Sequence, residues 1–334
     1  MSRQKHLGLG LIGLALCALA LALSLAVGVI RVPPGEILDV LAGRGGESLA
    51  RTLVLEMRLP RGIGALGVGA ALGTAGCLLQ ALLRDPLASP SMIGTAQASG
   101  FGRVLGVYLG FSFAASVVLS FLMAAAGTLL VLAVARSRRS FPSQIVLLAG
   151  INVGLLFAAL IGLVQYASRD EGQLSRMVLL LLGGLWQVTW EPLRIIAPLT
   201  LVGIGIGLLG ARRLDLFSLG EESADRLGLA TKHSGPAILA LACLLTSLAV
   251  SIAGVIAFVG LIVPHAARRL VGPAHERRLP ASAFLGGLLV LGVDCIARTV
   301  VAPNELPLGV LTSLLGVPFF LYLLRSTARR GART

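Results

Sequence analysis

Eight long, nearly uncharged apolar stretches divide this chain, and each has the length of a membrane-spanning helix. Crossing the hydrocarbon core of a bilayer takes about 20 residues in an α-helix. The eight stretches are 7–30, 62–83, 113–135, 145–167, 193–211, 235–256, 281–301 and 308–325. Two further stretches, 92–110 and 257–270, are apolar but interrupted. The sequence therefore predicts about ten membrane helices.

The residues inside these stretches favour helices over a β-barrel. Leu, Ala, Val and Gly dominate them without the two-residue alternation of barrel strands. Of the 334 residues, 56% are hydrophobic and 13% are charged, which is too few charges to solvate a soluble protein of this size. The first stretch exceeds the roughly 7–15 residues of a cleaved signal peptide, so we expect it to be retained. We expect one all-α polytopic membrane domain over residues 1–334.

Several glycines recur at four-residue spacing within these stretches. Small residues at this spacing let membrane helices approach each other closely. We therefore expect helix packing at three sets: Gly69 and Gly73; Gly102, Gly106 and Gly110; and Gly203 and Gly207.

The basic residues predict the orientation of the chain, because loops retained in the cytoplasm carry an excess of Lys and Arg. With a cytoplasmic amino terminus and ten helices, 18 of the 28 basic residues fall on the inner side and nine on the outer side. Both termini are therefore expected to be cytoplasmic. The net charge of +13 is spread over helix ends, which argues against nucleic-acid binding.

The inner loop at about 212–234 balances four basic against four acidic residues and carries the apolar spacing of one or two short amphipathic helices. Gly220 and Gly228 would let the chain turn between and after these helices. Apolar side chains would face a cytosolic partner; they belong to Leu216, Leu219, Ala224, Leu227 and Leu229. The alternative is an ordinary solvated or interfacial loop.

The outer loop at about 168–192 should contain a short extra helix before the next span. Trp186 and Trp190 would anchor it at the membrane interface. Arg169 and Arg176 are placed to attract an anionic substrate at the entrance to a transport path, or else to pair with Asp170 and Glu171.

Four segments of the chain resemble one family of membrane proteins, the permease subunits of ATP-driven importers for iron chelates and cobalamin (type II importers). These segments are 58–100 with its turn RDPLASP, SLGEESADRLGL at 218–229, GVIAFVGLIVPHAARRL at 254–270, and NELPLGVLTSLLGVPFFLYLL at 304–324. Residues 1–57 and 103–145 match the family only generically. The resemblance implies ten helices in each subunit, two copies of the subunit, two ATP-binding subunits and one periplasmic binding protein.

The resemblance also implies roles for particular residues. In this family the 218–229 segment sits in a groove of the ATPase subunit, which points to Leu219, Gly220, Glu221, Glu222, Ala224, Leu227 and Gly228 as coupling residues. Corresponding outer arginines receive acidic residues of the binding protein, which points to Arg58, Arg61 and Arg298. A guanidinium suits such docking because it pairs bidentately with a carboxylate.

Polar residues inside the apolar stretches are costly there and are therefore candidates for lining the transport path. These are Gln80, Asn152 and Gln165. Asn152 and Gln165 lie roughly 140° apart around one helix, so they do not both face one pore squarely. Asp294 precedes Arg298 by four residues, which favours an ion pair within the helix.

The chain shows no chemistry of its own that would make it an enzyme. Its lysines, Lys5 and Lys232, do not follow glycine, which excludes a Gly-rich phosphate loop ending in Lys. ATP and Mg²⁺ would therefore be bound by a separate ATPase subunit. His265 in VPHAARR lacks the partners that a metal site needs, so we expect no cofactor or metal on this chain and place Pro264 and His265 at the cytosolic interface.

These observations lead to one preferred function and to alternatives. The preferred function is import of a bulky iron chelate, haem before ferric siderophore, through the inner membrane of a bacterium. Cobalamin is a third substrate within the same family. A carrier driven by an ion gradient is the alternative from another class, with Asp294 as its coupling carboxylate. A polytopic membrane enzyme is a weaker alternative, because no GxSxG, HExxH or Asp-rich motif occurs.

Overall fold

The computed structural model describes residues 3–28, 30, 32–44, 48–135 and 143–331, with side chains from 13 to 321 except 14 and 221. All regular elements in these ranges are helical. The elements are α1 (Arg3–Ala26), α2 (Pro34–Leu41), α3 (Leu49–Arg51), a π-helical stretch (Thr52–Arg58), α4 (Leu59–Leu83), a 3₁₀ turn (Pro90–Ile93), α5 (Thr95–Tyr108), α6 (Phe113–Ala135), α7 (Ser143–Tyr166), α8 (Glu171–Leu182), α9 (Trp190–Leu209), α10 (Ala211–Ser218), α11 (Glu221–Arg226), α12 (Thr231–Ala253), α13 (Val259–Val271), α14 (His275–Ala297) and α15 (Leu308–Gly331).

Each of the ten predicted stretches coincides with a helix, which confirms the all-α membrane fold. Six helices in the described ranges are long and apolar enough to cross a bilayer, and two shorter apolar segments lie in α1 and α15. The interruptions expected at 92–110 and 257–270 are real. α5 and α13 have 14 and 13 residues, or about 20 Å, less than the roughly 30 Å of the hydrocarbon core. Gly94 and Phe258, both at positive φ, immediately precede them.

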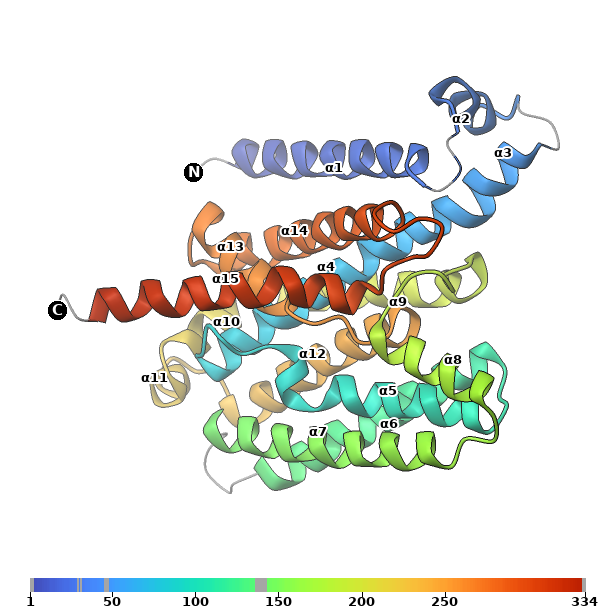
Figure 1. Cartoon of the computed structure of the whole chain (residues 1–334). Coiled ribbons are helices and arrows are strands. Elements are labelled where there is room, and N and C mark those ends of the chain that lie inside the picture. Colours follow the sequence, from blue (N-terminus) through green and yellow to red (C-terminus); the bar gives the residue numbers. More distant parts are fainter. Residues whose placement is uncertain (1–2, 29, 31, 45–47, 136–142, 332–334) are drawn as a thin grey trace.

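The long helices lie roughly parallel to one axis, with short helices at both ends (Figure 1). One end carries α10 and α11, and the opposite end carries α2, α3 and α8. We call these the α10/α11 end and the α2/α8 end. The short helices α2 and α3 were not predicted from the sequence. Of the two, α3 begins a continuous helical segment, Leu49–Leu83, which extends beyond the other spans at the α2/α8 end.

Helix α4 is the centre of the fold, with 19 of its 25 residues buried, and α14 packs along it. Their backbones touch, because a Cβ atom on Gly69 would overlap the carbonyl of Gly286, and one on Gly73 would overlap that of Ser282. Gly102 and Gly106 pack in the same manner against α6. The predicted packing role is confirmed at these positions. It is wrong for Gly110, which lies in an exposed turn at φ +71° with open space around it.

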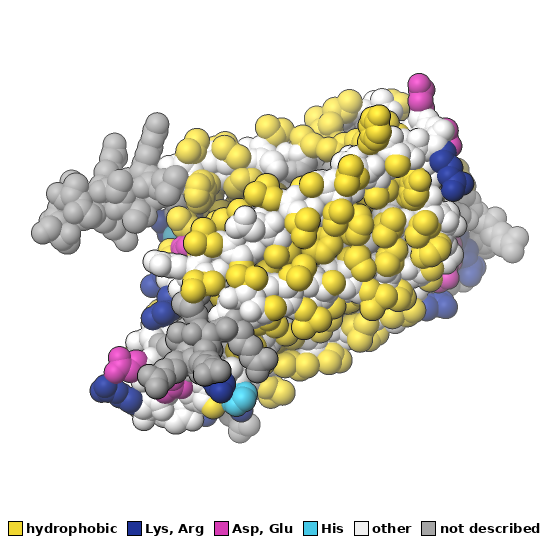
Figure 2. Space-filling model, turned by 90° about the horizontal axis from the view of Figure 1, so that it is seen from below, with side chains coloured by type: hydrophobic (Ala, Val, Ile, Leu, Met, Phe, Trp, Pro, Cys, Tyr) yellow, Lys and Arg dark blue, Asp and Glu magenta, His cyan; other side chains and the backbone are white. Residues whose placement is uncertain are grey.

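The outward faces of α6, α7 and α9 carry large exposed apolar side chains. On α7, for example, Leu148, Leu155 and Leu163 are each more than 60% exposed. Figure 2 shows the result on the face of the molecule seen from below, which is a broad hydrophobic surface bounded at both ends by charged side chains. A surface of this kind suits the hydrocarbon core of a bilayer, with the charges at the two interfaces.

Candidate functional site

The α10/α11 end contains the predicted pair of short helices, α10 and α11. Gly220 separates them at φ +102°, and Gly228 follows α11 at φ +86°. Both conformations are readily adopted only by glycine, as the sequence predicted. Asp225, just before the second turn, accepts hydrogen bonds from the backbone N–H and the hydroxyl of Thr231, and these bonds hold the pKa of its carboxyl below its usual value.

Only part of the predicted apolar face of this loop is exposed. Leu219 and Leu227 are 61% and 60% exposed, and they flank α11 as two separate apolar side chains. Ala224 and Leu229 are buried against the membrane helices, so their expected exposure is wrong, and Leu216 is half-buried. A hydrophobic residue in a short loop helix can pack inward onto the bundle as readily as outward onto a partner.

One acidic residue of the same loop is exposed to solvent and also paired within the chain. Glu222 forms an exposed ion pair of 2.6 Å with Arg226, one helical turn along α11. The side chain of Glu221 lies outside the described part of the structure. Two apolar side chains with a paired charge between them would suit a protein partner with an apolar groove.

At the α2/α8 end, the three predicted docking arginines lie together but are engaged within the chain. Arg61 bridges two carboxylates, with Nη2 2.8 Å from Asp294 Oδ1 and 2.8 Å from Glu305 Oε2. Arg298 Nε lies 3.1 Å from Asp294 Oδ2, which confirms the predicted pair within α14. Arg58 donates hydrogen bonds to the carbonyls of Leu25 and Ile30. The role of these arginines in docking stays a prediction.

Most of the charged side chains in this cluster are buried. The Asp294 side chain is fully buried and Arg298 is 4% exposed, whereas Glu305 keeps 28% exposure. Two guanidinium groups compensate the buried carboxylate, which would otherwise be very costly there. The bonds from Arg61 to Asp294 and Glu305 span 233 and 244 residues of sequence, so spacing along one helix gave no signal of them.

The polar residues predicted to line the path are widely separated. Gln80 is buried and joins three helices, accepting a hydrogen bond of 2.5 Å from Arg278 on α14 and donating one of 3.3 Å to the Leu261 carbonyl on α13. Asn152 is exposed on α7 and donates to the Leu148 carbonyl of its own helix. Gln165 is partly exposed near the end of α7. The structure does not bring these three residues together, and their role in the path stays a prediction.

The outer loop contains the expected short helix, α8. Its Asp170 caps the helix by accepting a hydrogen bond of 2.7 Å from the Gln173 backbone N–H. Arg169 and Arg176 are exposed, and neither forms an ion pair with another described residue. The Arg169 guanidinium instead lies 5.9 Å from the centre of the Tyr108 ring. The Trp190 indole N–H donates to the Leu55 carbonyl at 2.8 Å, and the anchoring of Trp186 and Trp190 at the membrane interface stays a prediction.

His265 on α13 packs against an aromatic ring. Its ring lies edge-on to Phe319, with 6.2 Å between the ring centres. Among the described residues, no group of three or more His, Cys, Asp or Glu side chains is arranged to hold a metal ion.

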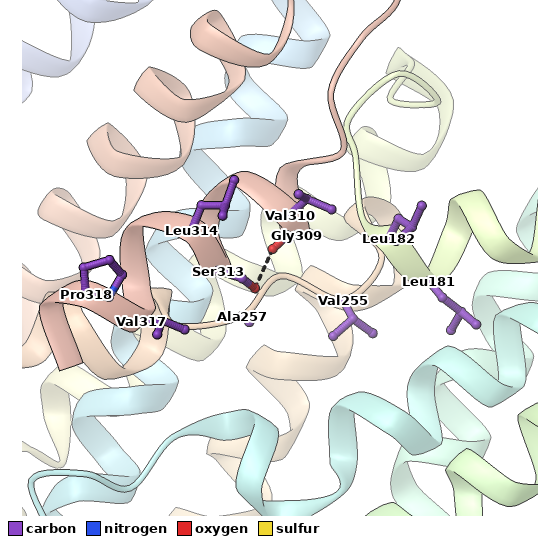
Figure 3. A pocket seen from close by; sticks show the side chains of 10 residues that line it. All are labelled: Leu181, Leu182, Val255, Ala257, Gly309, Val310, Ser313, Leu314, Val317 and Pro318. Carbon is purple, nitrogen blue, oxygen red and sulfur yellow. Dashed lines mark hydrogen bonds between the residues drawn. The ribbon is translucent and has the colours of Figure 1, made fainter. Parts of the chain in front are cut away.

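An apolar groove of about 630 Å³ lies between α8, the segment after α12, and α15 (Figure 3). Backbone hydrogen bonds join the three segments beside it, from Gly184 N–H to Ala253 at 2.8 Å and from Leu308 N–H to Gly183 at 2.9 Å. Ser313 contributes a hydroxyl, which donates to the Gly309 carbonyl at 2.7 Å. The groove is lined by Leu181, Leu182, Val255, Ala257, Gly309, Val310, Ser313, Leu314, Val317 and Pro318.

The groove was not predicted as a site. Its lining comes from three segments far apart in the sequence. Two glycines let these backbones pack closely, because Cβ atoms on Gly254 and Gly309 would overlap the carbonyls of Leu180 and Leu182. Glycine alone in the sequence does not show which backbone it will contact.

Known proteins resemble this chain over nearly its whole length. The hemin transport system permease protein HmuU of Yersinia pestis is 37% identical over 276 residues, covering 81% of this chain and 82% of that protein. The cobalamin import system permease protein BtuC of Halobacterium salinarum is 37% identical over 286 residues, covering 84% and 75%. A solved metal-chelate type ABC transporter in an inward-facing conformation superposes with a TM-score of 0.83, at 31% identity, over 94% of this chain and 97% of that one.

A family model agrees with these similarities and with the resemblance noted in the sequence. The model described as the FecCD transport family matches residues 16–326, which span every helix from α2 to α14 together with the second part of α1 and most of α15. This chain belongs to the FecCD transport family.

Proposed function

We propose that this chain is the membrane-spanning permease of an ATP-driven importer for a bulky metal chelate. The observation that carries the proposal is the combination of a membrane bundle with two exposed apolar side chains, Leu219 and Leu227, at one polar end. ATP would be hydrolysed by two separate subunits that bind the α10/α11 end. This end and both termini of the chain would lie in the cytoplasm. The opposite end would face the periplasm and receive a binding protein.

The test of this function is ATP hydrolysis by the permease reconstituted in lipid with its ATPase subunit. Hydrolysis should rise when binding protein loaded with haem, a ferric siderophore or cobalamin is added, and only one loaded form should give the full rise. Changing Glu221 and Glu222 to Lys should remove it. A permease that forms no complex with an ATPase subunit would overturn the proposal and favour a gradient-driven carrier.

The contact with the ATPase gives a first prediction, the double substitution of Leu219 and Leu227 by Asp. Buried apolar anchors supply much of the affinity of a protein interface, so we expect affinity for the ATPase subunit to fall by more than about tenfold, or 1.4 kcal/mol. Both side chains are exposed, so the melting temperature of the isolated permease should stay unchanged. Co-purification and a thermal-shift assay measure the two effects.

Leu38 on α2 provides the matched control for this double variant. It is 67% exposed at the opposite end of the molecule. Leu38→Asp should leave ATPase binding at its wild-type level. Equal binding by the double variant and the wild type would contradict the assignment of the α10/α11 end.

A second copy of this chain would complete the transport path, with the groove between α8 and α15 on the path. Exposed apolar side chains run along α15 from Leu314 and Val317, which line the groove, to Leu321 beyond it. The lining is apolar apart from one hydroxyl, and such a surface binds a large chelate weakly enough to release it. The solved metal-chelate transporter shares this fold at a TM-score of 0.83, which supports a transport role for the bundle.

The groove gives a second prediction, Leu314→Trp. The larger ring would project into the groove, so we expect substrate uptake to fall about tenfold or more while the permease still assembles with its ATPase. Leu201→Trp on α9 is the matched control, since Leu201 is 70% exposed and is not among the residues that line the groove. Uptake into proteoliposomes is the measurement. Normal uptake by Leu314→Trp would place the path elsewhere.

Among substrates we favour haem, followed by a ferric siderophore and then cobalamin. Arg169, just before α8, and Arg176, within it, are exposed on the short helix whose last two residues line the groove, and they would attract the carboxylates of an anionic chelate. Sequence identity does not rank the ligands, because the hemin and the cobalamin permeases are both 37% identical to this chain. Competition among the three loaded binding proteins measures the preference directly.

Docking of the binding protein would involve the Arg58, Arg61 and Arg298 cluster. Glu305 is the most exposed member of that cluster and already occupies one side of Arg61. A carboxylate of the binding protein would therefore have to replace Glu305 or bind beside it. Against the gradient-driven alternative, Asp294 is held by two arginines at the end of α14, whereas a coupling carboxylate needs to exchange a proton or ion.

A further inference from the structure

Two aspartates of the loop between α9 and α12 each cap the amino terminus of a membrane helix. Asp215 on α10 accepts a hydrogen bond of 3.0 Å from the backbone N–H of His275, the first residue of α14. Asp225 on α11 accepts one of 3.0 Å from the backbone N–H of Thr231, the first residue of α12. The first N–H groups of a helix have no partner within it, and a carboxylate there satisfies them and the positive end of the helix dipole.

Each cap is reinforced by a side-chain bond to the same residue. The His275 Nδ1–H donates to Asp215 at 2.6 Å, and the Thr231 hydroxyl donates to Asp225 at 2.7 Å. A second, exposed ion pair of 2.7 Å joins Arg212 on α10 to Glu276 on α14. Each short helix is therefore attached to one span by at least two hydrogen bonds.

The first turn of α14 is in turn attached to two more helices. Arg278, 6% exposed, donates to Gln80 on α4 at 2.5 Å and to the Pro264 carbonyl on α13 at 3.3 Å. From there α14 runs along α4 in close backbone contact to the Asp294 and Arg61 cluster at the far end. A displacement of α10 would therefore move α14 and α4 together, because packed helices shift as rigid bodies.

We propose that Asp215 and Asp225 are the joints through which α10 and α11 pass the motion of the ATPase to the membrane helices, Asp215 to α14 and Asp225 to α12. The inference rests on the proposed function, since it needs an ATPase bound at Leu219 and Leu227. These two side chains flank α11, so a partner that binds both would move α11, which carries Asp225 and directly follows α10 with Asp215. Asp215 and Asp225 are positioning residues, and neither needs to touch the ATPase or the substrate.

The first experiment separates coupling from assembly, using Asp215→Ala and Asp225→Ala in the complete transporter. We expect each variant to bind the ATPase and hydrolyse ATP within about twofold of wild type, while substrate moved per ATP falls by about tenfold or more. Asp215→Asn and Asp225→Asn keep an acceptor oxygen and should recover most of the transport. Ser48→Ala is the matched control, because it removes a helix cap from α3 at the opposite end.

Three results would overturn the proposal. One is unchanged transport per ATP in both alanine variants. Another is loss of ATPase binding, which would make the aspartates part of the docking surface. The last is an equal loss of transport per ATP in Ser48→Ala, which would show a general effect of lost helix caps. If an alanine variant fails to fold, the Asn variants carry the same comparison, with a smaller expected fall.

A second experiment follows the motion directly with spin labels in the dimeric transporter. Arg213 on α10 and Thr299 beyond the far end of α14 are both exposed. In the wild type, ATP should change the distance between the two copies at both positions. In Asp215→Ala, the change at Arg213 should persist and the change at Thr299 should be lost. A change at Thr299 equal to that of wild type would overturn the joint, whereas no change at Arg213 in the wild type itself would count against the proposed function.

Discussion

Asp294→Asn is expected to lower the free energy of unfolding of this protein by about 3 kcal/mol, the lower end of the range for breaking a buried ion pair. Asp294 is fully buried and compensates Arg61 and Arg298, which are themselves 11% and 4% exposed. The amide keeps the shape of the carboxylate but not its charge. Arg298 would lose its one ion pair among the described residues, while Arg61 would keep Glu305. Thermal and denaturant unfolding in detergent would measure the loss.

Glu305→Gln is the matched control for this prediction. Glu305 pairs with the same arginine at the same distance of 2.8 Å but keeps 28% of its side chain exposed, so water replaces much of what the variant loses. We expect a cost of less than about 1 kcal/mol, as for exposed pairs. Equal losses in Asp294→Asn and Glu305→Gln would contradict the importance that we assign to burial. A double-mutant cycle of Asp294 and Arg61 would isolate the pair itself.

Gly69→Val is expected to have the second large effect, and to prevent recovery of a stable folded permease. Even one added carbon at Gly69 would overlap the carbonyl carbon and oxygen of Gly286, which are backbone atoms of α14 and have no free rotation to escape. Overpacking of a core commonly costs about 1–3 kcal/mol, and a clash between two helix backbones belongs at or above the upper end. Yield of monodisperse protein and thermal unfolding are the measurements.

Gly67→Val separates this clash from the intrinsic effect of replacing glycine in a helix. Gly67 lies on α4 two residues earlier, and an added Cβ atom there meets no atom within 4 Å. Its substitution should leave the melting temperature nearly unchanged, since valine is a somewhat better helix former than glycine. Normal stability of Gly69→Val would show that α4 and α14 can separate at little cost, which would also weaken the rigid connection that we propose between the two ends.

Much of the α10/α11 end could be predicted from local sequence. Two short helices, the turns at Gly220 and Gly228 and the exposure of Leu219 and Leu227 follow from helix propensity, glycine conformations and apolar spacing. What local sequence did not reveal is that Ala224 and Leu229 face the bundle, and that Asp215 and Asp225 cap distant helices. Those properties depend on which helix ends lie beside the loop, and spacing within the loop carries no information about that.

The sequence by itself determined that the chain lies in a bilayer, that its fold is all-α and where each span lies, because hydropathy and local propensity act over neighbouring residues. Its motifs also determined the family. Only the tertiary structure decided which face of each span meets protein and which meets lipid, since both surroundings are apolar and a membrane helix shows little polar contrast between its faces. For the same reason only the structure joined Arg61 to Asp294 and Glu305, and assembled the groove from α8, the segment after α12 and α15. These contacts bring together residues far apart in the sequence, and their energy comes from packing and charge compensation between helices.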